Sequence, residues 1–70
     1  MLTEKMKLII RTIAECDMNR NEAGRVLYMH RNTIDYQCER IKDITGLSPK
    51  NFYDLIILLR MIQGDENDNT

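Results

Sequence analysis

The sequence has few of the residues on which disulfide-stabilised and membrane-spanning proteins depend. Its 70 residues include only two cysteines, Cys16 and Cys38. Two cysteines without a recognisable signal peptide do not make a disulfide framework, so both are expected to be reduced thiols on apolar helix faces. No apolar run approaches the ~20 residues that a membrane-spanning helix needs. These absences exclude a small disulfide-stapled domain and a membrane span.

The residue combinations that enzymes and metal sites require are also missing. A structural zinc site needs four cysteine or histidine ligands, but only His30 can join the two cysteines. Cys38 and His30 do not suit a catalytic pair, because eight helical residues span about 12 Å and Cys38 falls on the inward face. We find no paired acids and no phosphate-binding loop. The sequence therefore predicts no enzyme, no cofactor and no metal site.

An excess of one charge is absent as well. Ten lysines and arginines stand against eleven acids, which gives a formal net charge of −1. Three of the acids lie in the segment GDENDNT, residues 64–70, which has no apolar residue and is expected to be a disordered acidic tail. The remaining residues 1–63, predicted to form one small domain, carry ten bases and eight acids. Charge neither favours nor excludes a nucleic-acid partner.

The first third of the chain has the apolar periodicity of helices. A first helix is predicted over residues 3–16, with Thr3 as its N-cap. Its apolar residues recur at spacings of three and four, as on one helix face: Leu2, Met6, Ile9, Ile10 and Ile13. Asn19 is the expected N-cap of a second helix over 20–28, and Glu22 stands where the reciprocal member of a capping box belongs.

Two further helices complete an all-α fold of four helices. The third is predicted over residues 31–45 and ends at Gly46 in the left-handed conformation, with Leu47 folding back on its last turn. Ser48 is the expected N-cap of a fourth helix over 49–63, and Pro49 is suited to its first position. No segment has the alternating pattern of a strand.

The spacing between the second and third helices is typical of a helix-turn-helix motif. Ala23 is small where the two helices should cross, and Leu27 and Ile34 are apolar where they should lock the crossing angle. Val26 is placed beside them on the buried face. A polar first turn, HRNT at residues 30–33, precedes the apolar inward positions of the third helix.

The outward face of the third helix carries the residues that can read DNA. If Ile34 and Cys38 point inward, then Asn32, Tyr36 and Arg40 point away from the core. An asparagine amide can pair with adenine and an arginine with guanine in the major groove. The candidate DNA contacts are His30, Arg31, Asn32, Thr33, Tyr36 and Arg40, together with Arg20 and Arg25 on the outward face of the second helix as phosphate contacts.

Several of these residues also have a purely structural interpretation. Arg31 and Arg40 could be solvated surface residues, and Asn32 could serve only as an N-cap with Asp35 as its partner. His30 could pack at the turn and cap a neighbouring helix end. An exposed tyrosine at position 36 has the weakest structural explanation.

Residues 19–62, NRNEAGRVLYMHRNTIDYQCERIKDITGLSPKNFYDLIILLRMI, resemble the C-terminal DNA-binding domain of PucR-type bacterial regulators, which include purine-catabolism and sugar-diacid regulators. The spacing is more distantly similar to Fis-like domains. The pattern L-x-x-H-R-N-T-L-x-Y-R-L-x-x-I followed by T-G is met by Ala23 upstream, Leu27, His30, Arg31, Asn32, Thr33, Tyr36, Ile41, Thr45 and Gly46, with Ile34 in place of leucine.

This resemblance implies a non-enzymatic transcription regulator that binds duplex DNA in the bacterial cytoplasm, with residues 31–45 as recognition helix in the major groove. Family members usually carry a ligand-sensing part upstream, which is absent from this chain. Gln37 replaces the family's usual arginine, Asp35 places an acid in the groove-facing turn, and Cys38 replaces leucine. We therefore expect weak DNA binding by an isolated monomer.

The predicted fourth helix has more apolar surface than a domain of this size can cover. Its core stripe is assigned to Phe52, Leu55, Ile56, Leu59 and Ile62. A second apolar face then remains, and a helix that is hydrophobic on every side should be covered on every side. We expect a homodimer through Tyr53, Ile57, Leu58 and Met61. The alternative is a helical protein-interaction module that does not bind DNA.

Overall fold

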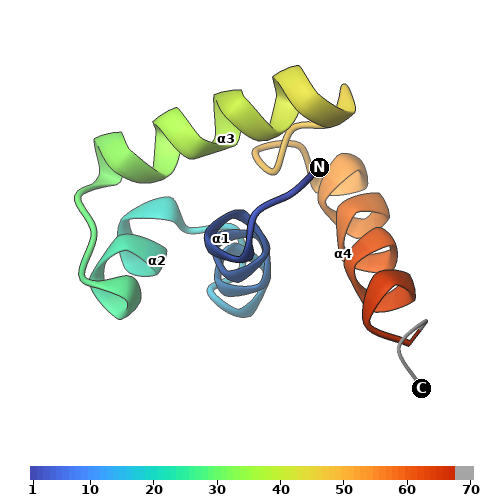
Figure 1. The fold of residues 1–70 in the computed structure, drawn as a ribbon. Helices are drawn as coiled ribbons and strands as arrows, with labels where there is room; N and C mark the ends of the chain where they lie inside the picture. Colours follow the sequence, from blue (N-terminus) through green and yellow to red (C-terminus); the bar gives the residue numbers. More distant parts are fainter. Residues whose placement is uncertain (68–70) are drawn as a thin grey trace.

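The computed structural model describes residues 1–67, and they form four helices without a strand (Figure 1). These are α1 (Glu4–Glu15), α2 (Arg20–Leu27), α3 (Arg31–Thr45) and α4 (Phe52–Asn67). The predicted all-α fold is confirmed. Helix α4 continues to Asn67, past the expected end at residue 63. It thus takes in the first part of the segment 64–70 expected to be a disordered tail, and residues 68–70 lie outside the described residues.

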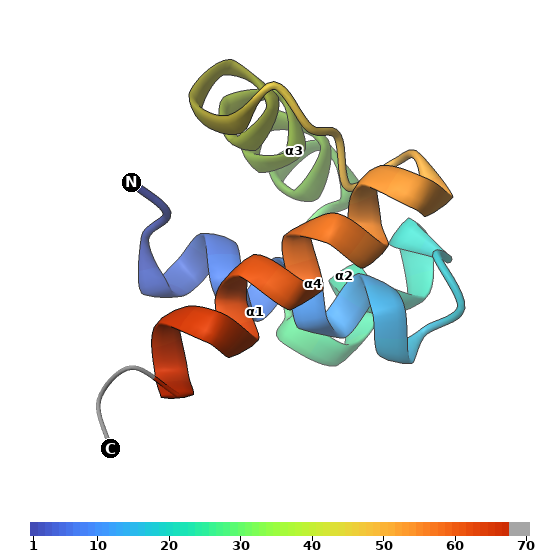
Figure 2. The ribbon, with the colours of Figure 1, turned by 90° about the vertical axis from the view of Figure 1, so that its right-hand side faces the viewer.

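Helix α1 is the central element of the domain, because it packs against each of the other three helices. Helix α3 runs above it, with α2 and α4 on opposite sides (Figure 1), and α4 lies across α1 (Figure 2). The apolar stripe predicted for α1 is confirmed in the core. The buried apolar residues are Met6, Ile9, Ile10, Ile13, Ala23, Ile34, Cys38, Ile41, Leu55, Leu58 and Ile62.

Local hydrogen bonds at the helix ends explain why the first three helices begin and end where the sequence predicts. The Thr3 hydroxyl accepts from the backbone N–H of Met6 at 3.1 Å, and the Asn19 side chain accepts from that of Glu22 at 3.0 Å. The carboxylate of Glu22 pairs with Arg25 at 3.5 Å, so the capping box is formed in one direction only. Gly46 has the expected left-handed φ of 78°.

The predicted start of the fourth helix is wrong by three residues. Ser48 and Pro49 form a turn before the helix, closed by the N–H of Asn51 donating to the Ser48 carbonyl at 3.0 Å. The side chain of Asn51 accepts from the N–H of Asp54 at 3.1 Å. The Asp54 carboxylate in turn accepts from the N–H of Ser48 at 3.1 Å. Asn51 is therefore the N-cap of α4. The hydrogen bond between Asp54 and Ser48 holds the preceding turn against the first turn of the helix.

The buried stripe of α4 also differs from the predicted one. Leu58 is fully buried, whereas Phe52 and Ile56 are 56% and 38% exposed. The assignment of Leu58 to a dimer interface is therefore wrong, and it belongs to the core stripe with Leu55 and Ile62. Because α4 is apolar on nearly all sides, its sequence alone does not define which stripe faces α1.

Candidate DNA-binding surface

The turn between α2 and α3 depends on a glycine. A Cβ atom at Gly24 would lie 2.5 Å from the carbonyl oxygen of Met29, which is a backbone atom. The N–H of Met29 donates to the Gly24 carbonyl at 2.8 Å. Ala23 is buried at the crossing as predicted, whereas the role of Gly24 was not predicted. The available signal was that glycine inside a helix is unfavourable unless the backbone must approach closely.

Tyr28 is the C-cap residue of α2 and begins this turn. It has a left-handed backbone with φ of 56° and a side chain that is 97% exposed. Val26 in the preceding helix was expected to be buried but is 53% exposed, since α2 is short and turns its other face to α1 and α3. Tyr28 is thus an exposed residue of the turn that was not among the predicted site residues.

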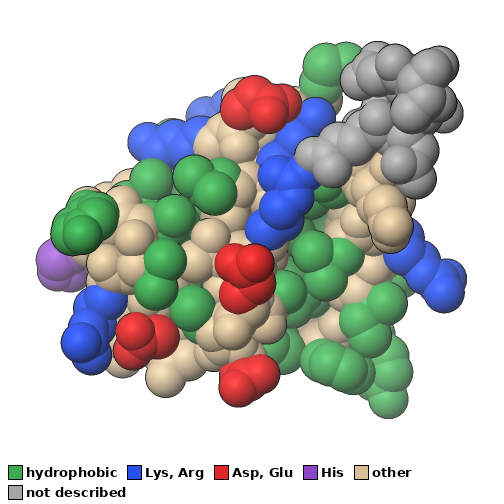
Figure 3. All heavy atoms as spheres, turned by 90° about the horizontal axis from the view of Figure 1, so that it is seen from below, with side chains coloured by type: hydrophobic (Ala, Val, Ile, Leu, Met, Phe, Trp, Pro, Cys, Tyr) green, Lys and Arg blue, Asp and Glu red, His purple; other side chains and the backbone are tan. Residues whose placement is uncertain are grey.

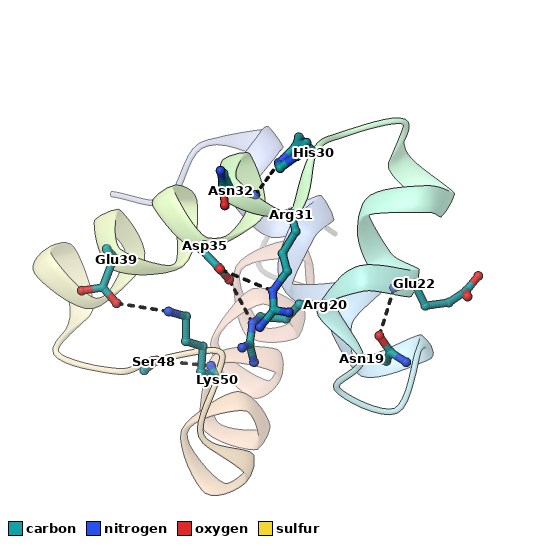
Figure 4. A network of polar contacts seen from close by, with 10 residues as sticks. All are labelled: Asn19, Arg20, Glu22, His30, Arg31, Asn32, Asp35, Glu39, Ser48 and Lys50. Atoms are coloured by element: carbon teal, nitrogen blue, oxygen red, sulfur yellow. Dashed lines mark hydrogen bonds and ion pairs between the residues drawn. The ribbon is translucent and has the colours of Figure 1, made fainter.

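His30 caps α3. Its Nδ1 atom accepts from the backbone N–H of Asn32 at 3.0 Å (Figure 4). Because Nδ1 accepts, the proton of the neutral ring is on Nε2. His30 is exposed, so its Nε2–H is a hydrogen-bond donor at the surface. The structural role expected for His30, capping a neighbouring helix end, is thus confirmed: the helix is α3, which begins at the next residue. The interpretation of Asn32 as the N-cap is wrong, and its exposed side-chain amide is not used in capping α3.

The predicted division of α3 into a buried and an outward face is confirmed. Ile34, Cys38 and Ile41 are fully buried. On the opposite side, Tyr36 is 58% exposed, and its hydroxyl oxygen accepts from Nη1 of Arg40 at 3.4 Å. The ring of Tyr36 is therefore not part of the core, and Thr33 is half-buried at the edge of the outward face.

Asp35 joins two arginines beside the outward face (Figure 4). Its Oδ1 atom lies 2.9 Å from Nε of Arg20 in α2, and its Oδ2 atom lies 3.6 Å from Nε of Arg31. The Arg20 side chain is only 25% exposed, so its placement on the outward face of the second helix is wrong. Instead it ties α2 to α3. The carboxylate of Asp35 is ion-paired with both arginines, so it does not add an unpaired negative charge to the surface.

The positive residues of the turn surround an open hollow of about 780 Å³. Its lining comprises Asn21, Gly24, Arg25, Tyr28, Met29, His30 and Arg31. The side chain of Arg25 is 80% exposed and only loosely paired with Glu22. The structure therefore brings His30, Arg31 and Arg25 together at one end of α3, while Tyr36 and Arg40 lie further along the same helix.

The described residues contain neither a metal-binding cluster of three or more His, Cys, Asp or Glu side chains nor a helix long and apolar enough to cross a membrane. Cys38 lies on the buried face of α3, and this burial raises the pKa of its thiol to about 11. A thiol with this pKa is almost entirely protonated at neutral pH, so it is a packing residue and not a nucleophile.

The short helix, glycine-dependent turn and longer helix with a polar outward face define a helix-turn-helix domain. Residues 8–61 match the family model of the PucR C-terminal helix-turn-helix domain, and the chain belongs to this family. It is therefore a domain of non-enzymatic DNA-binding proteins that regulate transcription.

One curated relative is similar to part of the chain. The chain is 43% identical over 43 residues to the "Carbohydrate diacid regulator" of Escherichia coli (strain K12). This alignment covers 61% of the chain and 11% of the relative, so the chain spans only a small part of that protein's length. No solved structure matches the chain.

Proposed function

We propose that this chain binds specific duplex DNA sequences as a bacterial transcription regulator, with α3 as the recognition helix in the major groove. The proposal rests on the exposed side-chain amide of Asn32, which does not cap α3. Because His30 supplies the cap of α3, the amide of Asn32 is left exposed on the first turn, where a recognition helix contacts base edges. An asparagine amide there can pair with N6 and N7 of adenine.

The surrounding residues suit supporting roles in the same complex. Arg31 keeps its terminal Nη atoms for guanine or phosphate, because its contact with Asp35 is made through Nε at 3.6 Å. The Nε2–H of His30 and the guanidinium of Arg25 can donate to phosphates beside the turn. Thr33 can reach a phosphate or a thymine methyl group from the edge of the outward face. Arg20 contributes by holding α2 against α3 and is not proposed as a direct contact.

We further propose that the domain acts as a homodimer through α4. This helix packs against α1 alone among the described helices, and it leaves five large apolar side chains exposed: Phe52, Tyr53, Ile56, Ile57 and Met61. Figure 3 shows hydrophobic side chains gathered on the side where α4 lies. A two-fold partner would cover this patch with its own copy. It would also place two recognition helices on half-sites about 34 Å apart.

The same exposed face favours the second candidate function, a protein-interaction module that does not bind DNA. The two functions differ in what duplex selection returns. Repeated selection of bound duplexes from a random pool should enrich one sequence arranged as an inverted repeat. Failure to enrich any sequence, with the protein folded, would contradict specific DNA binding and favour the interaction module. The DNA-binding proposal also places the working protein in the cytoplasm, bound to the nucleoid.

The dimer has a separate test. Ile57→Glu should give a folded monomer in sedimentation that loses most of its affinity for the selected repeat. Gln63→Glu adds the same charge at an exposed position of α4 outside the apolar patch, and it should remain dimeric. A monomeric wild-type protein at high micromolar concentration would contradict the dimer while leaving the recognition helix unaffected.

A further inference from the structure

The positive side chains along the two sides of α3 differ in whether they form an ion pair with an acidic side chain. On the side facing α2, Asp35 pairs with Arg20 and Arg31. Further along that side, Glu39 pairs with Lys50 at 3.7 Å (Figure 4). Arg20, Arg31 and Lys50 are therefore already partnered on this flank, and they have less charge to offer to a polyanion.

The opposite flank of α3 has a different charge arrangement. Here the start of α1 meets the middle of α3 around a hollow of about 410 Å³, lined by Thr3, Lys5, Met6, Tyr36, Gln37 and Arg40. None of these lining residues is acidic. Lys5 is exposed and has no ion pair with the side chains of residues 1–64. Two residues further on, Lys7 is paired with Glu4 at 3.3 Å, so the neighbouring acid is engaged away from Lys5.

The hydrogen bond between Arg40 and Tyr36 leaves donors of both side chains available to an anion in this hollow. Arg40 donates Nη1 to the hydroxyl oxygen of Tyr36 at 3.4 Å. Its partner is neutral, so the guanidinium keeps its full charge and its other N–H donors. A hydroxyl whose oxygen accepts from arginine still has its own proton to donate. The ammonium of Lys5, the guanidinium of Arg40 and the O–H of Tyr36 are thus three donors around one open space.

We propose that this hollow is a binding site for a phosphate of the DNA backbone, with Lys5 and Arg40 as the principal contacts and Tyr36 as an additional hydrogen-bond donor. The inference rests on the proposed insertion of α3 into the major groove, since the phosphates of one strand then run along this flank. It extends the DNA-binding surface to the start of α1, where Lys5 lies outside the matched residues 8–61. The site adds a phosphate contact on the α1 side of α3 to those proposed for His30 and Arg25 beside the turn.

The salt dependence of DNA binding tests this site directly. Each phosphate contact contributes about −0.9 to the slope of log K against log salt concentration for duplex DNA. Lys5→Gln and Arg40→Gln should each make this slope shallower by up to about 0.9 on a random-sequence duplex, and the double variant by up to about twice that. Lys50→Gln, which removes a charge already paired with Glu39, and Arg60→Gln on α4 are matched controls for the loss of one positive charge.

The possible results separate this site from the function on which it rests. Wild-type protein that binds no duplex would overturn both proposals. Wild-type binding with the same slope for Lys5→Gln, Arg40→Gln and the two controls would overturn only the phosphate site. Lys5→Arg should keep the wild-type slope, because it retains the charge. Circular dichroism should show unchanged melting for the variants, since Lys5 and Arg40 are both exposed.

Discussion

Replacing Gly24 by alanine tests the close approach on which the helix-turn-helix geometry depends. The added methyl group would sit 2.5 Å from the carbonyl oxygen of Met29, well inside normal contact distance. The opposing atom belongs to the backbone, so no side-chain rotation relieves the overlap. The turn is also held by the hydrogen bond from the Met29 N–H to the Gly24 carbonyl at 2.8 Å. Gly24→Ala must therefore strain or displace the turn that positions His30.

The expected magnitude is a balance of two effects. Alanine is favoured over glycine in a helix interior by up to about 1 kcal/mol, whereas overpacking a tight contact costs about 1–3 kcal/mol. The contact at 2.5 Å places Gly24→Ala toward the upper part of that range, so we expect a net loss of about 1–2 kcal/mol. For a domain of this size, each kcal/mol lowers the melting temperature by about 4–8 °C.

Gly64 supplies a matched control for this experiment. It lies in α4, and a Cβ atom there would meet nothing within 4 Å. Gly64→Ala should therefore raise the free energy of unfolding slightly, by up to about 1 kcal/mol. Urea unfolding followed by circular dichroism measures both variants. If Gly24→Ala is as stable as Gly64→Ala, the backbone approach does not constrain the turn and the reasoning is refuted.

Three further predictions concern other parts of the domain. Tyr28→Gly should increase the free energy of unfolding by about 1 kcal/mol, because a left-handed backbone is strained for a residue with a side chain and the exposed ring packs on nothing that compensates; equal or lower stability in urea would contradict this. Leu58→Ala should cost about 2–5 kcal/mol as a core truncation, while Ile57→Ala should change the monomer's stability little, and similar losses for the two would contradict the observed stripe. Burial raises the pKa of Cys38 from 9.0 to about 11, so the folded state retains the thiol proton in this window and the free energy of unfolding should fall as pH rises from 9 to 11. Cys38→Ala should show a weaker decline over the same pH range, and identical declines would exclude this contribution.

The elements that the sequence predicted well are those with one strong apolar stripe or one unambiguous cap. In α3, Ile34, Cys38 and Ile41 recur on a single face, so the outward position of Tyr36 followed directly from helical geometry. At the start of α2, Asn19 stands three residues before Glu22, and this capping-box spacing distinguishes it from Asp17 and Asn21. Local spacing contains this information because the residues involved contact their neighbours within one or two turns.

The predictions that failed depended on choices between similar residues or on contacts distant in sequence. Ser48 and Asn51 are both good caps, and the carboxylate of Asp54 decides between them through the turn. The apolar residues of α4 allow several stripes, and packing against α1 selects the one containing Leu58. The pairing of Arg20 with Asp35 joins two different helices, so periodicity within either helix could not reveal it.

The central claim is that α3 reads base edges through Asn32, and the affinity of Asn32→Ala for two duplexes tests it most directly. Binding should be measured on the sequence selected from the random pool and on a random-sequence duplex at the same salt concentration. We predict a loss of about 1–3 kcal/mol on the selected sequence, a relaxed preference at one base pair, and little change on random DNA. Equal losses on both duplexes would contradict base recognition by Asn32.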